Sequence, residues 1–196
     1  PVIFPDASRF TRVDAPVVKQ KQVPAKQVQA PLRGSDQPIE PDWETSFATT
    51  DDANVFTVID ANNDGLTWGW SDSYDGSMRS EYSANNGNDD WLVTPPIHFL
   101  PGRQYIIKFN IGNAATNWVN SFEVKYGEGD NPAQFTKTLQ PTFEPKGDDF
   151  ETRTYYLTFD EEVTYRFGFH DNTEKAGSGR IVIDFVGIDN GAALDA

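Results

Sequence analysis

The sequence is poor in the residues on which most catalytic and metal chemistry depends. It has no cysteine, one methionine and two histidines, His98 and His170. Without cysteine, neither a disulfide framework nor a thiolate zinc site can form. The HExxH, GxSxG and P-loop motifs are also absent. We therefore expect no enzymatic activity and name no catalytic residue, although the many carboxylates leave a paired-acid hydrolase open on composition alone.

Positive charge and long apolar runs are scarce as well. The 196 residues carry 16 Lys and Arg against 30 Asp and Glu, which gives a net charge of −14. A chain this acidic is repelled by phosphate backbones, which argues against a nucleic-acid partner. No apolar stretch approaches the ~20 residues of a membrane span, so we expect no membrane insertion of this fragment.

The first 41 residues differ in composition from the remainder. Residues 1–33 hold six basic and two acidic side chains, a balance of +4 that leaves −18 for the rest. Prolines recur at positions 1, 5, 16, 24, 31, 38 and 41. Because proline interrupts helices and favours extended chain, residues 1–41 are predicted to be an extended basic linker. Such a segment can be a solvated connector, a binding site for an acidic partner, or a strip that lies against the acidic domain.

From Trp43 onward the sequence is typical of an all-β domain. Short runs rich in Val, Ile, Phe, Tyr and Thr are separated by Gly, Pro, Asn and Asp. Alternate residues are apolar in the runs 105–111, 122–126, 155–159 and 163–169, a pattern that buries one face of each strand. The run 180–189 is apolar at 181, 182, 183, 185, 186 and 188. It is predicted to be a central strand covered on both faces.

The turn after residue 59 carries the spacing of half a calcium loop. Asp60, Asn62 and Asp64 place oxygen-bearing side chains at alternate positions, and Gly65 follows where the chain must bend. A complete EF-hand is rejected, because its twelfth position would be Ser71 and a strand-like run precedes the turn. From the spacing alone, a calcium site and a plain polar turn both remain open.

The runs FTVIDANNDGLTWGW (residues 56–70) and DDWLVTPPIHFLPG (residues 89–102) carry a family resemblance. The sequence resembles the cleaved-adhesin domain of surface proteins and gingipain-type proteases from Bacteroidetes, a relative of MAM-like and galactose-binding jelly rolls. The resemblance implies a calcium-binding jelly-roll β-sandwich, here over residues 42–190, followed by a tail at 191–196. It also implies that Trp91 and Val93 lie in the core, and we expect His98, in the next strand, to face the core too.

The resemblance further implies a calcium that joins the first and last strands. Its ligands would be Asp184, in the run IVIDFVGID, and Glu44, which follows Trp43 here where the family usually has Phe. A carboxylate flanked by Ile183 and Phe185 needs a partner if it is buried. The alternative for Asp184 is a salt bridge with Arg166 or Arg180. Calcium is the expected ion at both places, because all candidate ligands are oxygens.

Three aromatic residues stand in polar surroundings that are typical of exposed loops: Trp70, Tyr74 and Trp118. Exposed rings on loops can form a recognition surface for a sugar or a protein. They can equally close the ends of a sandwich. Trp68 and Trp91 are expected in the core.

The sequence thus favours a non-catalytic recognition module, stabilised by calcium, that binds a host protein or a glycan through its loops. The alternative is a structural or accessory module of a larger secreted protease or glycan-degrading enzyme. The first residue is not Met, and no signal-like stretch follows. We therefore expect a fragment of a longer precursor, located outside the cell or at its surface, that contacts other domains of that precursor.

Overall fold

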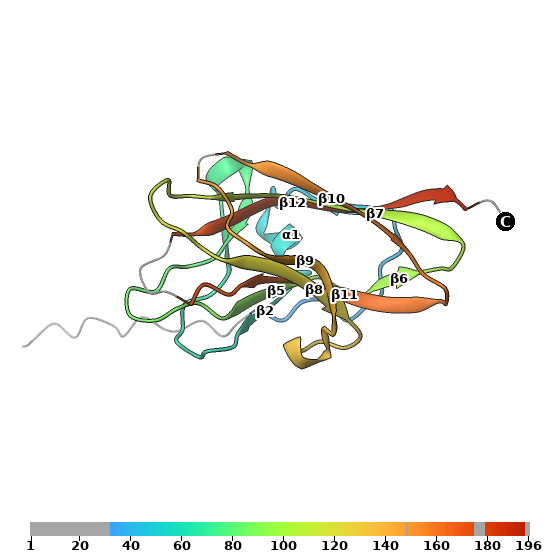
Figure 1. The fold of residues 1–196 in the computed structure, drawn as a ribbon, viewed down its shortest axis with the longest axis horizontal. Coiled ribbons are helices and arrows are strands. Elements are labelled where there is room, and N and C mark those ends of the chain that lie inside the picture. The colour runs from blue at the N-terminus through green and yellow to red at the C-terminus, as the bar shows by residue number, and fades with distance from the viewer. Residues whose placement is uncertain (1–31, 148, 175–178, 195–196) are drawn as a thin grey trace, which may run out of the picture.

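Two antiparallel β-sheets lie face to face in the computed structural model, which describes residues 32–147, 149–174 and 179–194 (Figure 1). In the first sheet the strand order is β10 (Glu151–Thr158), β7 (Arg103–Asn113), β12 (Ile181–Ala193), β4 (Ser77–Arg79) and β3 (Gly69–Ser71). Strand β1 (Trp43–Thr45) pairs with β12 on the same side as β4 but further along that strand.

The second sheet has the order β2 (Thr57–Asp60), β5 (Asp90–Val93), β11 (Val163–Asp171), β8 (Phe122–Gly127) and β9 (Lys137–Phe143). Strand β6 (Ile97–Phe99) pairs with the start of β11, and β5 pairs with its end. The only helical segments in the described part of the chain are α1 (Thr50–Ala53), η2 (Ser73–Asp75) and η3 (Pro132–Gln134). No helix described here is long and apolar enough to cross a membrane.

The core lies between the sheets and is built from the alternating residues of the strands. In β7, Tyr105, Ile107, Phe109 and Ile111 are all buried, while the residues between them are more exposed. Strand β12 is central, with β7 on one side and β1 and β4 on the other, and most of its apolar residues are buried. The predicted all-β jelly-roll sandwich is confirmed.

The domain extends beyond both predicted boundaries. Residues 32–41 do not behave as a linker: the Leu32 carbonyl accepts a hydrogen bond from the Val58 amide, and Ile39 forms a bridge with Ile97. At the other end β12 continues to Ala193, three residues past the predicted end of the domain. The rest of the predicted linker, residues 1–31, lies outside the described residues.

Three predicted core positions face the other way. Trp91 and Val93 are buried, but they form a separate cluster with Phe135 on the outer face of the second sheet. Their neighbour Leu92 points into the main core, and alternate residues of a strand point to opposite faces. His98 is likewise turned outward, because Ile97 and Phe99 on either side of it fill the core. Trp68 is buried in the main core, as expected.

Candidate metal centre and ligand groove

The turn after β2 folds its polar side chains back onto its own backbone. The Asp60 carboxylate accepts hydrogen bonds from the amides of Asp64 (3.3 Å) and Gly65 (2.9 Å). The Asn62 side-chain oxygen also accepts from the Asp64 amide (3.3 Å). Gly65 has φ +80°, the left-handed conformation that glycine adopts at no cost. The turn therefore gathers the oxygens of residues 60 and 62 on its concave side.

Strand pairing adds two further acids to this turn. Asp60 is opposite Asp90 in β5, and Asp90 is opposite Asp171 in β11. These three residues, here called the acid row, thus share one register across neighbouring strands. Both Asp90 and Asp171 are completely buried. From the sequence alone, the pair Asp89–Asp90 could extend a metal site or simply end a loop. The position of Asp90 depends on strands 30 and 81 residues away in the chain.

Asp90 is the least compensated member of the acid row. Neither of its carboxylate oxygens has a hydrogen-bond partner among the described residues, and Asp64 Oδ2 and Thr67 Oγ1 are also buried without one. The pKa of Asp90 is raised to about 8, chiefly by burial. The Thr67 side chain opposes this shift, and the nearby charges of Asp171, Asp60 and Asp64 add to it. A buried charge without a partner is costly, so this position needs either a proton or a cation.

The donors around Asp90 suit a hard cation. They are carboxylate, amide and hydroxyl oxygens, the ligands that calcium prefers. As the side chains stand, no three Asp, Glu or His residues within the described ranges converge tightly enough to hold an ion by themselves. A bound calcium would therefore draw on Asn62 and backbone carbonyls as well as on the acids.

The second predicted calcium site is less complete. Asp184 lies in a β-bulge of β12, where its Oδ1 is buried without a partner. Burial raises its pKa, and the neighbouring Asn110 side chain opposes that shift. Glu44 is exposed on β1 opposite Gly187, and no contact places it beside Asp184. The salt-bridge alternative is wrong, because Arg166 is paired with Asp36 and Arg180 with Glu81.

The three predicted ligand-binding rings are all exposed. The Trp70 ring is fixed by its Nε1, which donates to the Phe47 carbonyl (2.9 Å). Tyr74 packs edge-to-face on Phe150, with ring centroids 4.9 Å apart. Trp118 is the most exposed of the three, at 56%. Of these residues, only Trp118 lines the groove described next.

A groove of about 570 Å³ opens beside Trp118. We call it the ring groove, and it is lined by Tyr82, Ala84, Ala114, Ala115, Trp118, Gly179 and Arg180. Tyr82 is 42% exposed, and the Arg180 guanidinium lies 4.7 Å from the centre of its ring. Tyr82 was missed in the sequence, although it stands in the same kind of polar stretch as Trp118.

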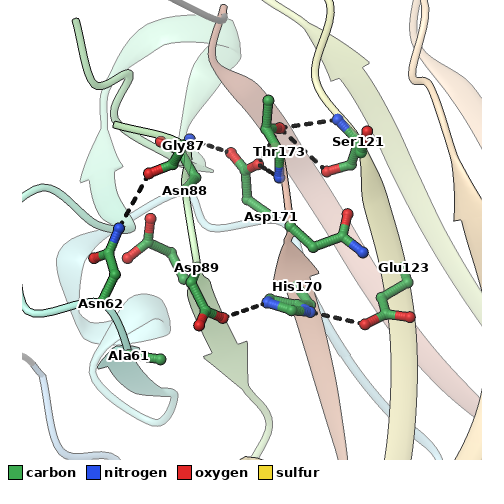
Figure 2. A network of polar contacts seen from close by, with 12 residues as sticks. Ala61, Asn62, Gly87, Asn88, Asp89, Ser121, Glu123, His170, Asp171 and Thr173 are labelled. Atoms are coloured by element: carbon green, nitrogen blue, oxygen red, sulfur yellow. Dashed lines mark hydrogen bonds and ion pairs between the residues drawn. The ribbon is translucent and has the colours of Figure 1, made fainter. Parts of the chain in front are cut away.

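Both histidines are held between carboxylates. His170 is stacked on Trp91, with ring centroids 3.7 Å apart. Its nitrogens contact Glu123 (2.8 Å) and Asp89 (2.7 Å), and Figure 2 shows these two contacts. His98 contacts Glu40 and Glu162, each at 2.6 Å. With both ring nitrogens engaged, each imidazole ties neighbouring segments together, and neither has a ring nitrogen free to serve as a general base.

No protein-family model matches the sequence, and no curated protein matches it either. Solved structures do match. The K1 cleaved-adhesin domain of Lys-gingipain from Porphyromonas gingivalis W83 is similar with a TM-score of 0.58 and 20% identity, over 76% of this chain and 98% of that one. The fold is that of the cleaved-adhesin domains. The K3 domain of the same protein is similar with a TM-score of 0.55 and 18% identity, over 68% of this chain and 90% of that one.

The same jelly roll also occurs in a carbohydrate-binding domain. The CBM22-1 xylan-binding domain of Xyn10C from Paenibacillus barcinonensis has a TM-score of 0.51 and 10% identity, over 77% of this chain and 95% of that one. At such identities the likeness to cleaved-adhesin and xylan-binding domains is one of fold.

Proposed function

We propose that this chain is a non-catalytic recognition module of the adhesin type, which works outside the cell and whose loops are stabilised by calcium. One observation carries the proposal: the exposed ring of Trp118 stands on a loop that buried polar side chains hold in place. The Asn113 side chain donates to the Trp118 carbonyl (3.1 Å) and to Asn120 (2.9 Å), and Asn120 donates to Asp171 of the acid row (3.2 Å). A large exposed ring on a rigid support is suited to binding.

The fold supports this proposal. The similar solved structures include adhesin domains and a xylan-binding domain, so the same sandwich carries binding surfaces in those proteins. The alternative, an accessory module that stabilises a larger secreted enzyme, uses the same scaffold without a ligand. A glycan array and a pull-down with host extracellular proteins separate the two functions, because uniformly negative results would leave only the accessory role.

Calcium is the second part of the proposal, and we place it at the acid row and the turn after β2. Asp60, Asp64 and Asp90, with the Asn62 oxygen, would hold it, and its charge would neutralise the buried Asp90 carboxylate. Since the ion would bind only the folded chain, it adds about 2.7 kcal/mol of stability when free calcium is a hundredfold above its dissociation constant.

Melting temperature, measured in calcium and then in a chelator, tests the metal site. The wild type should melt several degrees lower in chelator, and Asp64→Ala and Asp90→Asn should lose most of this difference. Asp184→Ala tests the Glu44–Asp184 site separately. Exposed Asp160→Asn is the matched control and should respond to calcium like the wild type. A melting point that the chelator leaves unmoved in the wild type would refute the calcium part of the proposal.

A further inference from the structure

We propose that the ring groove is a carbohydrate-binding site, which takes an uncharged pyranose sugar between Trp118 and Tyr82. The inference rests on the recognition function proposed above, and it names the site and the ligand class. Pyranose rings present a flat face of C–H groups that packs on aromatic rings, while their hydroxyls need hydrogen-bond partners at the edge. The ring groove offers both kinds of surface.

One buried network holds the backbone beside the two rings. Asn113 donates to the Trp118 carbonyl, and Asn88 donates to the carbonyl of Glu81, the residue before Tyr82 (3.2 Å). Asn88 also donates to the Asp171 carboxylate (2.8 Å), which Asn113 reaches through Asn120. Figure 2 shows the contact of Asn88 with Asp171. Loops that are anchored in the free protein lose little conformational entropy when a ligand binds.

The groove is open because small residues line it between the rings. Its other residues include three alanines and Gly179. A Cβ on Gly179 would lie only 2.4 Å from the Asn113 side-chain oxygen, so the close approach of this chain segment to the anchoring asparagine requires glycine. The volume of about 570 Å³ falls in the range of small-molecule sites.

The charges of the groove favour an uncharged ligand. Among the described residues, Arg180 is the one charged residue that lines the groove. Its positive charge is balanced by Glu81, because Arg180 Nε donates to Glu81 Oε1 at 2.8 Å. The guanidinium also covers part of the Tyr82 ring. Its remaining N–H groups can donate to sugar hydroxyls. Glycans rich in sulfate or uronic acid are disfavoured, because the whole chain carries a net charge of −14.

A glycan array of neutral and anionic oligosaccharides, followed by titration calorimetry with the best neutral hit, tests the site. We expect Trp118→Ala and Tyr82→Ala each to weaken binding by roughly tenfold or more, since stacking on one ring supplies about that factor. Tyr156→Ala is the matched control, because Tyr156 is an equally exposed ring (61%) on β10. It should bind like the wild type. Each variant should keep the wild-type melting temperature and calcium response, which shows that it is folded.

Three other outcomes would overturn this inference and can be told apart. If neutral glycans bind but only Trp70→Ala or Tyr74→Ala abolishes binding, the groove is wrong and the recognition function stands. If the groove variants instead lose a protein captured in the pull-down, or if only anionic glycans bind, the ligand class is wrong. If no glycan and no protein binds, the recognition function itself fails.

Discussion

At the scale of single residues, strand pairing is what buries the Asp90 carboxylate among other acids and makes its negative charge costly. In the sequence it is half of the acidic pair Asp89–Asp90 ahead of a strand, with nothing to distinguish the two. In the structure Asp89 reaches outward to His170, while Asp90 points inward beside Asp60 and Asp171. The turn residues Asp60, Asn62 and Asp64 could be predicted because they are adjacent in sequence. Asp90 could not, because only long-range pairing brings it to them.

The burial of Asp90 predicts how the stability of the protein in chelator depends on pH, and Asp90→Asn tests this dependence. Because the folded-state pKa of Asp90 is raised from the ordinary 3.8 to about 8, the folded protein retains a proton that the unfolded chain has lost between these values. Its stability should therefore fall as pH rises through this window, by up to about 1.4 kcal/mol per pH unit.

Asp90→Asn has no such proton to lose, so near pH 8 in chelator it should melt above the wild type, and the gap should close toward pH 5. Thermal melts at pH 5, 6, 7 and 8 provide the measurement, with Asp160→Asn as control. In calcium the order should reverse, since the amide cannot replace a carboxylate ligand. If the melting temperatures of wild type and Asp90→Asn changed in parallel from pH 5 to pH 8, the raised pKa would be contradicted.

At the scale of elements, His98 ties three segments of the second sheet together. It lies on β6, Glu40 lies in the chain that runs alongside, and Glu162 directly precedes β11. Hydrogen bonds that the ring donates to the carboxylates of Glu162 and Glu40 raise the pKa of His98 above its ordinary value of 6.5. The stabilisation is therefore fully present below pH 6.5 and is lost as pH rises through the folded-state pKa.

His98→Gln should lower the melting temperature at pH 5.5 by about 1–3 °C, the range expected for exposed ion pairs. The difference should shrink toward pH 8.5. Glu161→Gln, on the neighbouring exposed position, serves as control. An NMR titration of the His98 ring should give a midpoint above 6.5, with His170 variants used to assign the two imidazole signals. A midpoint below 6.5 would contradict the stabilising contacts of His98 with Glu40 and Glu162.

The elements also show which predictions a sequence pattern can support. Strict alternation in β7 predicted its buried face correctly, because every second residue is large and apolar. Strand β5 has no such contrast, because Trp91, Leu92 and Val93 are all apolar, so the pattern does not say which face meets the core. The answer depends on Phe135, which arrives from a distant loop and covers Trp91.

At the scale of the whole molecule, the domain begins before its first strand. The side chain of Arg166, on β11, is largely buried and pairs with Asp36 (2.9 Å), and it also contacts the Ser35 carbonyl (3.3 Å). The Val58 amide needs the Leu32 carbonyl (2.7 Å). Composition concealed this, because residues 32–41 share the proline content of the preceding segment, and proline content says nothing about tertiary contacts.

Two shortened chains, one beginning at Leu32 and one at Asp42, test how far the domain extends. The chain from Asp42 loses two partners of Arg166, although the Thr94 carbonyl remains, and it loses the partner of the Val58 amide. It also uncovers the apolar surface that Leu32 and Ile39 pack against. Leaving buried polar groups without partners and exposing apolar surface should lower its free energy of unfolding by about 2–4 kcal/mol. For a chain of this size that corresponds to a melting temperature lower by roughly 5–15 °C. In the chain from Asp42, Arg166→Met should recover part of the loss, since it removes the buried charge that has lost its Asp36 partner. Equal melting temperatures for the two shortened chains would show that residues 32–41 are a linker after all.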